Sequence, residues 1–230
     1  MPRIIVLWAL LLCCAHARAQ LSGRVAWVSD YRFRGVSLSQ DQPAIQASIN
    51  FDTSDGWYGG LFASSVKLQP DGGPRVQGVA YAGYARRMTS STHWEIGAEY
   101  VAFVGDSQYD YPEAYVGVVA ERVSARLYYA PRYFYDDASV LYAELNGSWP
   151  VGTRARLIGH LGWFRRNESG KSPYEPEPER IDARVGVGVA LGQFDLQLAW
   201  VMNDGQGAYY SYYSGHSDDE GWVLSVAHDW

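Results

Sequence analysis

Apolar and polar residues alternate along most of this chain, in runs of about ten residues, the length that a tilted strand needs to cross a membrane. The run 154–164 shows the pattern, with apolar positions at Ala155, Leu157, Leu161 and Trp163 and polar positions at Arg154, Arg156 and His160. A period of two predicts a β-strand with one apolar and one polar face. The pattern predicts an all-β protein of about twelve strands, at 22–34, 43–52, 57–66, 76–88, 93–103, 112–121, 124–134, 139–149, 154–164, 181–191, 194–203 and 221–230.

The connections between these segments differ in length according to their place in the order. Short connections follow the even-numbered segments, at 53–56, 89–92, 122–123, 150–153 and 192–193. Long connections follow the odd-numbered segments, at 35–42, 67–75, 104–111, 165–180 and 204–220, and the short segment 135–138 is an exception. Short turns on one side and long loops on the other are the plan of a transmembrane antiparallel β-barrel, an up-and-down meander.

The last predicted strand runs to the end of the chain, as WVLSVAHDW over residues 222–230. A terminal strand with few contacts would fray. In a closed barrel, by contrast, the last strand pairs with the first, because an open edge in lipid leaves backbone groups without hydrogen bonds. We therefore expect residues 20–230 to form one barrel.

Periodicity alone does not separate a barrel from a β-sandwich, in which the polar face would lie outside. Aromatic residues favour the barrel, because Trp and Tyr prefer the membrane–water interface. One predicted girdle lies at the short-turn end and comprises Trp27, Trp57, Trp94, Trp149, Phe194 and Trp230. The other lies near the long-loop end and comprises Tyr31, Phe33, Tyr100, Tyr133, Trp163 and Trp222. The alternative is that these residues are good strand formers packed in a core.

The N-terminal segment indicates export. Residues 1–19 contain Arg3, an apolar run and the sequence Ala17-Arg18-Ala19, which together resemble a cleaved signal peptide. Both cysteines, Cys13 and Cys14, lie within it, so a disulfide framework and thiolate metal sites are not expected. Without Arg3 and Arg18 the chain has 17 basic and 25 acidic residues, a formal charge of −8, which argues against nucleic acid as a partner.

If the apolar parity faces lipid, charged residues of the other parity line the lumen. The predicted lining residues are Arg24, Asp30, Arg32, Arg34, Glu95, Glu99, Glu113, Glu121, Arg126, Arg132, Glu144, Arg154, Arg156, His160, Asp182 and Arg184. Acidic and basic side chains concentrate on different arcs, with Glu144 interrupting the basic one. This favours an outer-membrane, porin-like channel for passive diffusion of small solutes, anions among them.

A non-conducting barrel is the alternative to a channel. The lumen could be closed by arginine–carboxylate pairs, which would leave a non-conducting structural or adhesive barrel. Twelve strands lie between the roughly 8 whose interior fills with side chains and the roughly 16–18 of open porins, so strand number leaves both possibilities.

Several stretches resemble a known family. VSDYRFRGVSLSQDQPAIQASINFD (28–52) and GWYGGLFASSV (56–66) resemble the N-terminal signature of the TorF family of proposed porins, and LYYAPRYF (127–134) and YAELNGSWPVGTRARLIGHLGW (142–163) resemble its later blocks. At 64–66 this chain has Ser-Ser-Val in place of Ser-Asn-Val, and the loops 165–180 and 204–220 depart from the family. The resemblance implies a proteobacterial outer-membrane barrel in contact with lipid and lipopolysaccharide. Resemblance to such proteins also implies that the assembly machinery reads the C-terminal strand.

An outer-membrane lipid hydrolase would need a histidine that activates a hydroxyl group. His216 is followed by Ser217, but adjacent residues of an extended chain point apart, and no G-x-S-x-G elbow occurs. The acidic run Asp218-Asp219-Glu220 could hold a divalent cation, although a solvated loop is the simpler interpretation. We therefore expect no enzyme activity, no catalytic residue, no cofactor and no metal site.

Overall fold

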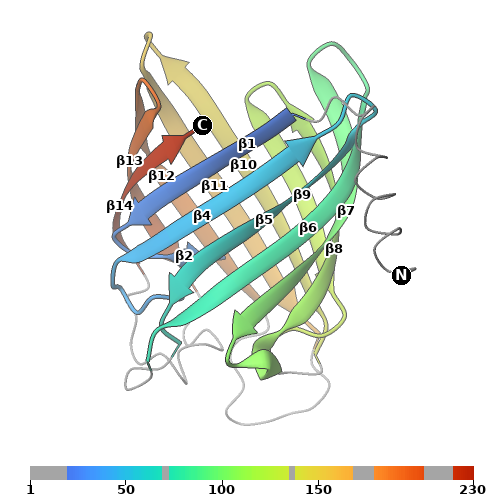
Figure 1. The fold of residues 1–230 in the computed structure, drawn as a ribbon, viewed down its shortest axis with the longest axis vertical. Helices are drawn as coiled ribbons and strands as arrows, with labels where there is room; N and C mark the ends of the chain where they lie inside the picture. The colour runs from blue at the N-terminus through green and yellow to red at the C-terminus, as the bar shows by residue number, and fades with distance from the viewer. Residues whose placement is uncertain (1–19, 69–72, 135–137, 168–178, 205–219) are drawn as a thin grey trace, which may run out of the picture.

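The computed structural model describes residues 20–68, 73–134, 138–167, 179–204 and 220–230. Twelve antiparallel strands close into one barrel in which consecutive strands pair and the last pairs with the first (Figure 1). They are β1 (Gln20–Val28), β4 (Ala44–Asp52), β5 (Trp57–Val66), β6 (Arg75–Arg87), β7 (Thr92–Val104), β8 (Tyr111–Ala120), β9 (Val123–Ala130), β10 (Val140–Val151), β11 (Ala155–Arg166), β12 (Glu179–Leu191), β13 (Phe194–Asn203) and β14 (Glu220–Asp229). The predicted all-β, twelve-stranded antiparallel barrel is confirmed. The predicted signal peptide lies outside the described residues.

The barrel closes at a seam between β1 and β14. Five residue pairs join the two strands, from Arg24 opposite Asp229 to Val28 opposite Ser225. Beyond them, Gly23 and Trp230 exchange two backbone hydrogen bonds, of 3.1 and 3.0 Å between N and O. A Cβ atom on Gly23 would lie 2.3 Å from the Trp230 indole, so the absence of a side chain there lets the terminal ring pack on the first strand.

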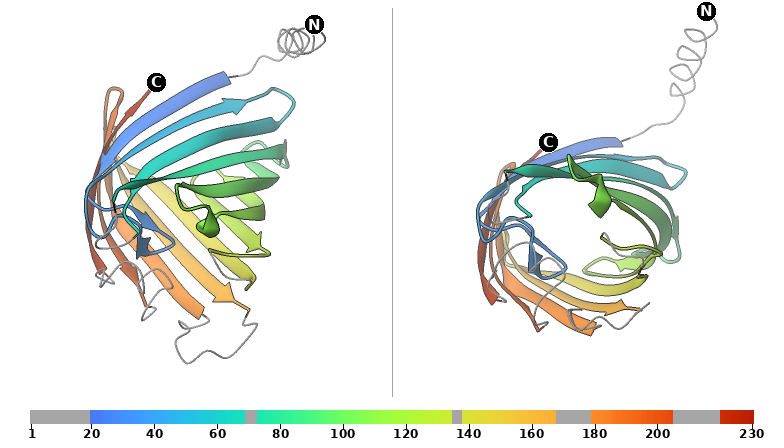
Figure 2. Two further views of the ribbon diagram at one scale, coloured as in Figure 1. Left: turned by 60° about the horizontal axis from the view of Figure 1, so that its bottom comes forward. Right: turned by 90° about the horizontal axis from the view of Figure 1, so that it is seen from below.

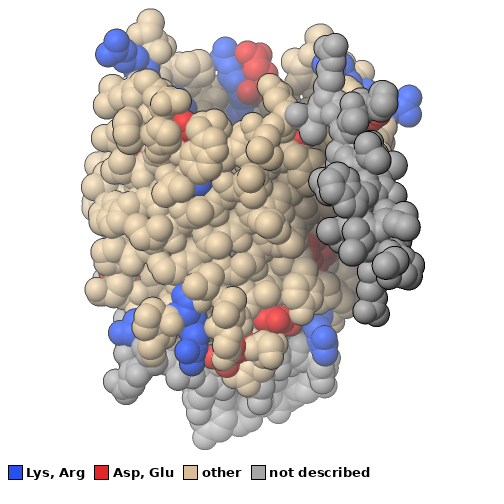
Figure 3. All heavy atoms as spheres, viewed as in Figure 1, with Lys and Arg blue, Asp and Glu red and all other residues tan. Residues whose placement is uncertain are grey.

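The outer face of the barrel is apolar. Outward side chains such as Leu157, Val185 and Leu198 are exposed, while Ile158 and Ala199, next to them on the same strands, are buried inside. In Figure 3 the middle of the visible face is mostly free of charged residues, which gather toward its two ends. Among the described residues no helix is long and apolar enough to cross a membrane.

β1 ends earlier than the alternation predicts. The predicted strand 22–34 stops at Val28, and residues 29–43 turn into the barrel instead of continuing its wall. Two short strands, β2 (Arg32–Phe33) and β3 (Val36–Ser37), form a hairpin in this segment. In the view along the barrel, this blue hairpin lies inside the ring (Figure 2). Its alternation therefore belongs to an inserted hairpin and not to the wall.

β9 also ends early, at Ala130 instead of residue 134. Pro131 has no N–H group to continue the ladder, so the strand stops before it. The connection to β10 thus covers residues 131–139, which removes the apparent exception among the long loops. Tyr133 and Phe134 of this connection are buried inside the barrel.

The structure changes part of the predicted aromatic girdles. Trp27 lies near the long-loop end of β1, opposite Ile45 at the start of β4, and not at the short-turn end. Tyr31, Phe33 and Tyr133 turn into the barrel, because the segments that carry them leave the wall. The aromatic residues at the expected strand ends are Trp57, Trp94, Tyr100, Trp149, Trp163, Phe194, Trp222 and Trp230.

A hydrophobic cluster fills part of the interior toward the long-loop end. Val36 and Leu38 from the hairpin segment, each 1% exposed, are packed among residues of the wall and of other connections. The wall and connections contribute Val66, Leu68, Val101, Phe103, Tyr109, Tyr111, Tyr133, Phe134, Val140, Tyr142 and Phe164. Tyr109 belongs to a short 3-10 helix, η1 (Ser107–Tyr109). The hairpin is thereby fixed to one side of the lumen.

Candidate functional site

The hairpin inside the barrel turns at Arg34 and Gly35. Their φ angles are +52° and +80°, and they join Phe33 to Val36, which pair across the hairpin. Two positive φ values at the two turn residues are typical of the type I′ turn of a two-residue hairpin. Glycine tolerates this conformation, whereas an arginine in it is strained, so other contacts must hold Arg34 in place.

Those contacts come from the opposite wall. Arg34 donates two hydrogen bonds to the Glu113 carboxylate on β8, with Nη1–Oε1 and Nη2–Oε2 distances of 2.9 and 2.6 Å. The guanidinium also lies over the Tyr142 ring, 4.4 Å from its centroid. Burial by itself lowers the pKa of Arg34. The Glu113 carboxylate and the nearby Tyr133 and Tyr111 raise this pKa by more than burial lowers it, so it lies well above its ordinary value. The tip of the hairpin therefore stays charged.

The other turn residue touches a different part of the wall. A Cβ atom on Gly35 would lie 2.5 Å from the Asp182 Cβ and 2.8 Å from the Asn203 Cβ, on β12 and β13. Because β8 is separated from these strands by β9, β10 and β11, the hairpin tip contacts two distant parts of the ring. It forms a strap across the lumen.

The base of the hairpin is held by an aspartate. The Asp30 carboxylate accepts hydrogen bonds from Arg32 Nε at 2.6 Å, from Ser37 Oγ at 2.6 Å and from Ser39 Oγ at 3.1 Å. The Tyr31 hydroxyl donates to Gln77 of β6 at 2.7 Å, and burial raises the pKa of this hydroxyl. The strap is thus anchored at its base and at its tip.

Most charged side chains of the lumen wall are paired. Toward the short-turn end, Asp195 accepts hydrogen bonds from Arg24 at 3.0 Å and from Arg156 at 2.8 Å. On the facing strands, Arg126 Nε donates to Glu95 at 2.5 Å. These pairs stiffen the wall and neutralise charge that a solute would otherwise meet.

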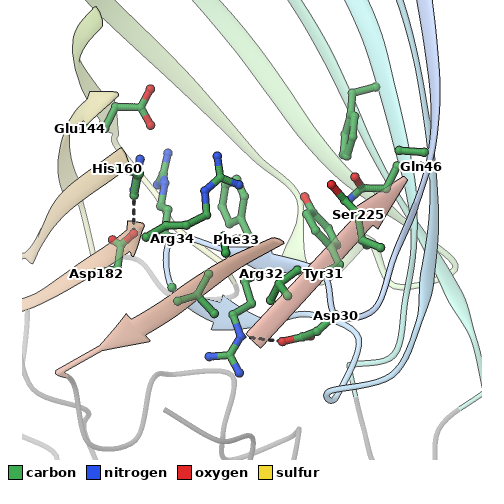
Figure 4. Close-up of a pocket in the computed structure, with 18 of the residues that line it drawn as sticks. Asp30, Tyr31, Arg32, Phe33, Arg34, Gln46, Glu144, His160, Asp182 and Ser225 are labelled. Atoms are coloured by element: carbon green, nitrogen blue, oxygen red, sulfur yellow. Dashed lines mark hydrogen bonds and ion pairs between the residues drawn. The ribbon is translucent and has the colours of Figure 1, made fainter. Parts of the chain in front are cut away.

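A second network surrounds His160. Its Nε2 lies 2.8 Å from Asp182 Oδ1, and its Nδ1 lies 2.7 Å from Asn146 Oδ1. The Tyr142 hydroxyl donates to Asp182 and lies 3.1 Å from His160 Nε2. Figure 4 shows the His160–Asp182 pair on the wall together with the hairpin side chains Tyr31, Phe33 and Arg34. Asp182 is therefore occupied by neighbouring donors.

A cavity of about 600 Å³ lies between the hairpin and the wall. The hairpin contributes Asp30 to Gly35, and the wall contributes residues from β1, β4 and β10 to β14, among others. Arg184 of β12 faces this cavity and is exposed in it. With the described residues it forms no ion pair and no hydrogen bond, so its charge is available to a solute.

The structure places the predicted lining residues in three settings. On the inward face of the wall lie Arg24, Glu95, Glu99, Glu113, Arg126, Glu144, Arg156, His160, Asp182 and Arg184. Asp30, Arg32 and Arg34 lie in the inserted hairpin segment and not on β1. Glu121, Arg132 and Arg154 are exposed in connections between strands, because the strands end before them.

Some lumen residues were missing from the prediction. Asp195 bridges two arginines and Asp229 pairs with Arg24, yet only their parity in the sequence places them on the polar face. The inward tyrosines Tyr58, Tyr115 and Tyr142 give no signal of their own, since tyrosine suits either face of a strand. His216 and Ser217, which the sequence analysis considered and disfavoured as a hydrolase pair, lie outside the described residues. Among the described residues no group of three His, Cys, Asp or Glu side chains could hold a metal ion.

A protein-family profile matches residues 14–229, almost the whole chain. The chain belongs to that family. It is described as "Bacterial protein of unknown function (Gcw_chp)". This description names no activity. It also does not name the TorF family, so membership of that family stays a prediction for this Gcw_chp protein. No curated protein sequence matches it.

Solved structures of porins have a similar fold. A structure described as "KdgM porin" is 11% identical, with 90% of this chain and 98% of that chain covered and a TM-score of 0.57. A structure described as "KdgM porin in complex with disordered oligogalacturonate" is also 11% identical. The match covers 91% of this chain and 98% of that chain, with a TM-score of 0.53. A structure of the "NanC porin" is 10% identical. The match covers 90% of this chain and 98% of that chain, with a TM-score of 0.52. At identities of 10–11%, this likeness shows that the Gcw_chp chain shares the fold of these porins and nothing more.

Proposed function

We propose that this protein is a bacterial outer-membrane channel through which small solutes, anions in particular, diffuse passively. The observation that carries the proposal is the cavity of about 600 Å³ beside the hairpin. Arg184 lines this cavity and has no ion-pair partner among the described residues. A cationic side chain without a partner attracts anions more than one neutralised by a carboxylate, because it offers its full charge and its N–H donors.

The outer face supports the location. A closed barrel satisfies the backbone hydrogen bonds of every strand, which is the requirement for spanning lipid. Its apolar exterior suits contact with acyl chains, and lipid and lipopolysaccharide are the proposed surroundings. The outer-membrane assembly machinery is a proposed partner during insertion. The C-terminal strand, which closes the barrel through the Gly23–Trp230 hydrogen bonds, is the segment that it would recognise.

A second candidate is a non-conducting barrel with a structural or adhesive role. The inserted hairpin and the interior hydrophobic cluster favour it, because they occupy part of the lumen. The paired charges of the wall are equally compatible with a barrel that is only stabilised by them.

Single-channel recording of the refolded barrel in a planar bilayer separates the two candidates. Heat modifiability on an SDS gel first shows that the barrel has formed. We expect discrete conductance steps and, in a KCl gradient, a reversal potential displaced toward that of chloride. A folded barrel without conductance would favour the structural or adhesive role.

A further inference from the structure

Among the residues that the structure describes, one arginine at the long-loop mouth of the barrel has neither an ion-pair nor a hydrogen-bond partner. Arg180 is the second residue of β12 and lies on the same inward face as Asp182 and Arg184. It is only 6% exposed, and the central carbon of its guanidinium, Cζ, lies over the Phe164 ring of β11, 3.8 Å from the ring centroid. The Nε and Nη2 atoms of this side chain are buried and have no hydrogen-bond partner.

The carboxylates closest in the strand ladder are already occupied. Asp182, two residues further in, accepts hydrogen bonds from Tyr142 and lies against His160. Glu179 precedes Arg180 on the outer face and is paired with Arg165 at 3.6 Å. By contrast, Arg24, Arg34, Arg126 and Arg156 each contact a carboxylate within 3.0 Å. Burying a charged group without a partner is costly, so a site that does so calls for an explanation.

The orientation of the guanidinium indicates what it binds. Its Nε–H and one Nη2–H point in the same direction along one edge of the plane, which matches the two oxygens of a carboxylate. The Phe164 ring lies 3.8 Å from Cζ and so occupies the space beside the guanidinium, which leaves the edge with Nε–H and Nη2–H as the one for a ligand. A neutral hydroxyl group has one oxygen and no charge, so it cannot form the two parallel, charge-assisted hydrogen bonds that a carboxylate forms with these donors.

We propose that Arg180, held on Phe164, binds the carboxylate group of a solute at the long-loop mouth of the barrel. The proposal deepens the channel function and rests on it for the role of the site in passage, but binding itself does not require conduction. Arg184 lies four residues further along the same face of β12, about 13 Å along the strand at roughly 3.3 Å per residue, and therefore deeper in the lumen. A carboxylate released by Arg180 would next meet Arg184 in the cavity, so the two arginines mark a route for carboxylated solutes.

Saturation-transfer difference NMR on the detergent-folded barrel tests this site with D-glucuronate as the probe and D-glucose as its neutral counterpart. We expect transfer to glucuronate and much less to glucose. Arg180→Gln should weaken glucuronate binding about tenfold or more, because two charge-assisted hydrogen bonds are lost. Arg180→Lys keeps the charge but not the paired donors, and it should also bind several-fold more weakly than the original protein. Arg165→Gln, which removes an outward arginine of β11, is the matched control and should bind as the original does.

The folding of the variants gives an independent readout. Since Arg180→Gln removes a buried charge that has no partner, the variant should fold and should resist denaturant at least as well as the original protein. Equal glucuronate binding by the original, Arg180→Gln and Arg180→Lys proteins would overturn the site, as would transfer to glucose equal to that to glucuronate. Binding that depends on Arg180 in a barrel that does not conduct would support the site and refute the channel. Conduction without such binding would do the reverse.

Discussion

Arg34, at the tip of the inserted hairpin, is joined to Glu113 on the far wall by two hydrogen bonds of 2.9 and 2.6 Å. The side chains of both residues are almost completely buried, at 4% and 0% exposure. This pair fixes the tip of the hairpin, because it holds a strained turn residue against the wall by two charge-assisted hydrogen bonds. We call it the Arg34–Glu113 latch.

Breaking the latch should release the hairpin. Glu113→Ala leaves a buried, unpaired guanidinium, which costs about 3–5 kcal/mol of stability. Arg34 is then more stable in water than in the wall, so the hairpin should move and the single-channel conductance should rise. Denaturant unfolding followed by tryptophan fluorescence measures the first effect, and bilayer recording measures the second.

The control for the latch is Asp229→Ala, which breaks a more exposed pair with Arg24. Exposed pairs contribute about 0–1 kcal/mol, so this variant should unfold almost as the original does. The double variant Arg34→Met, Glu113→Met should recover much of the lost stability, because neither buried charge remains. A Glu113→Ala barrel as stable as the Asp229→Ala barrel, with unchanged conductance, would show that the latch does not hold the hairpin.

The turn residue Gly35 should tolerate no side chain. Gly35→Ala places a Cβ 2.5 Å from that of Asp182, in addition to the positive φ. Gly152→Ala is matched to it, since Gly152 has a φ of +77° and a Cβ there meets nothing within 4 Å. We expect a loss of about 1–2 kcal/mol for Gly152→Ala from the backbone alone, and about 1–3 kcal/mol more for Gly35→Ala from the clash. Equal losses in denaturant unfolding would mean that the hairpin tip does not press on β12.

Ion selectivity should depend on Arg184. Reversing one charge about 8 Å from a permeating ion in water changes its energy by about 1 kcal/mol, so Arg184→Glu should lower the chloride-to-potassium permeability ratio about fivefold or more. The reversal potential in a KCl gradient measures this ratio. Arg154→Glu is the control, because Arg154 is exposed in the turn between β10 and β11 and should leave the ratio nearly unchanged. A larger effect at Arg154 than at Arg184 would place the selective region at the rim and not in the cavity.

The seam between the first and last strands should depend on Gly23. Gly23→Val would push into the Trp230 indole, and overpacking of this kind costs about 1–3 kcal/mol. Gly78→Val on β6 is the control, since a Cβ there meets nothing within 4 Å and valine suits a strand. We expect a smaller fraction of heat-modifiable, folded barrel for Gly23→Val only. If the two variants fold equally well, the terminal tryptophan does not secure the seam.

The sequence by itself determined the wall of the barrel. Alternation with a period of two gives each strand its lipid-facing and lumen-facing sides, so residues such as Leu157 and Arg156 were assigned to the correct faces. Turn lengths gave the order of the strands, because neighbours in an antiparallel meander are also neighbours in sequence. Both signals are local and can be read from one chain.

The tertiary structure alone decided what fills the lumen. Residues 29–34 continue the alternation of β1, so nothing local showed that Arg34 leaves the wall to meet Glu113, which lies 79 residues further along the chain. Whether a lumen charge is free or paired is likewise set by distant strands. Asp195 neutralises Arg24 and Arg156, while Arg184 and Arg180 form no ion pair with the part of the chain that the structure describes. Coulomb attraction and burial depend on distance in space, which the order of residues does not contain.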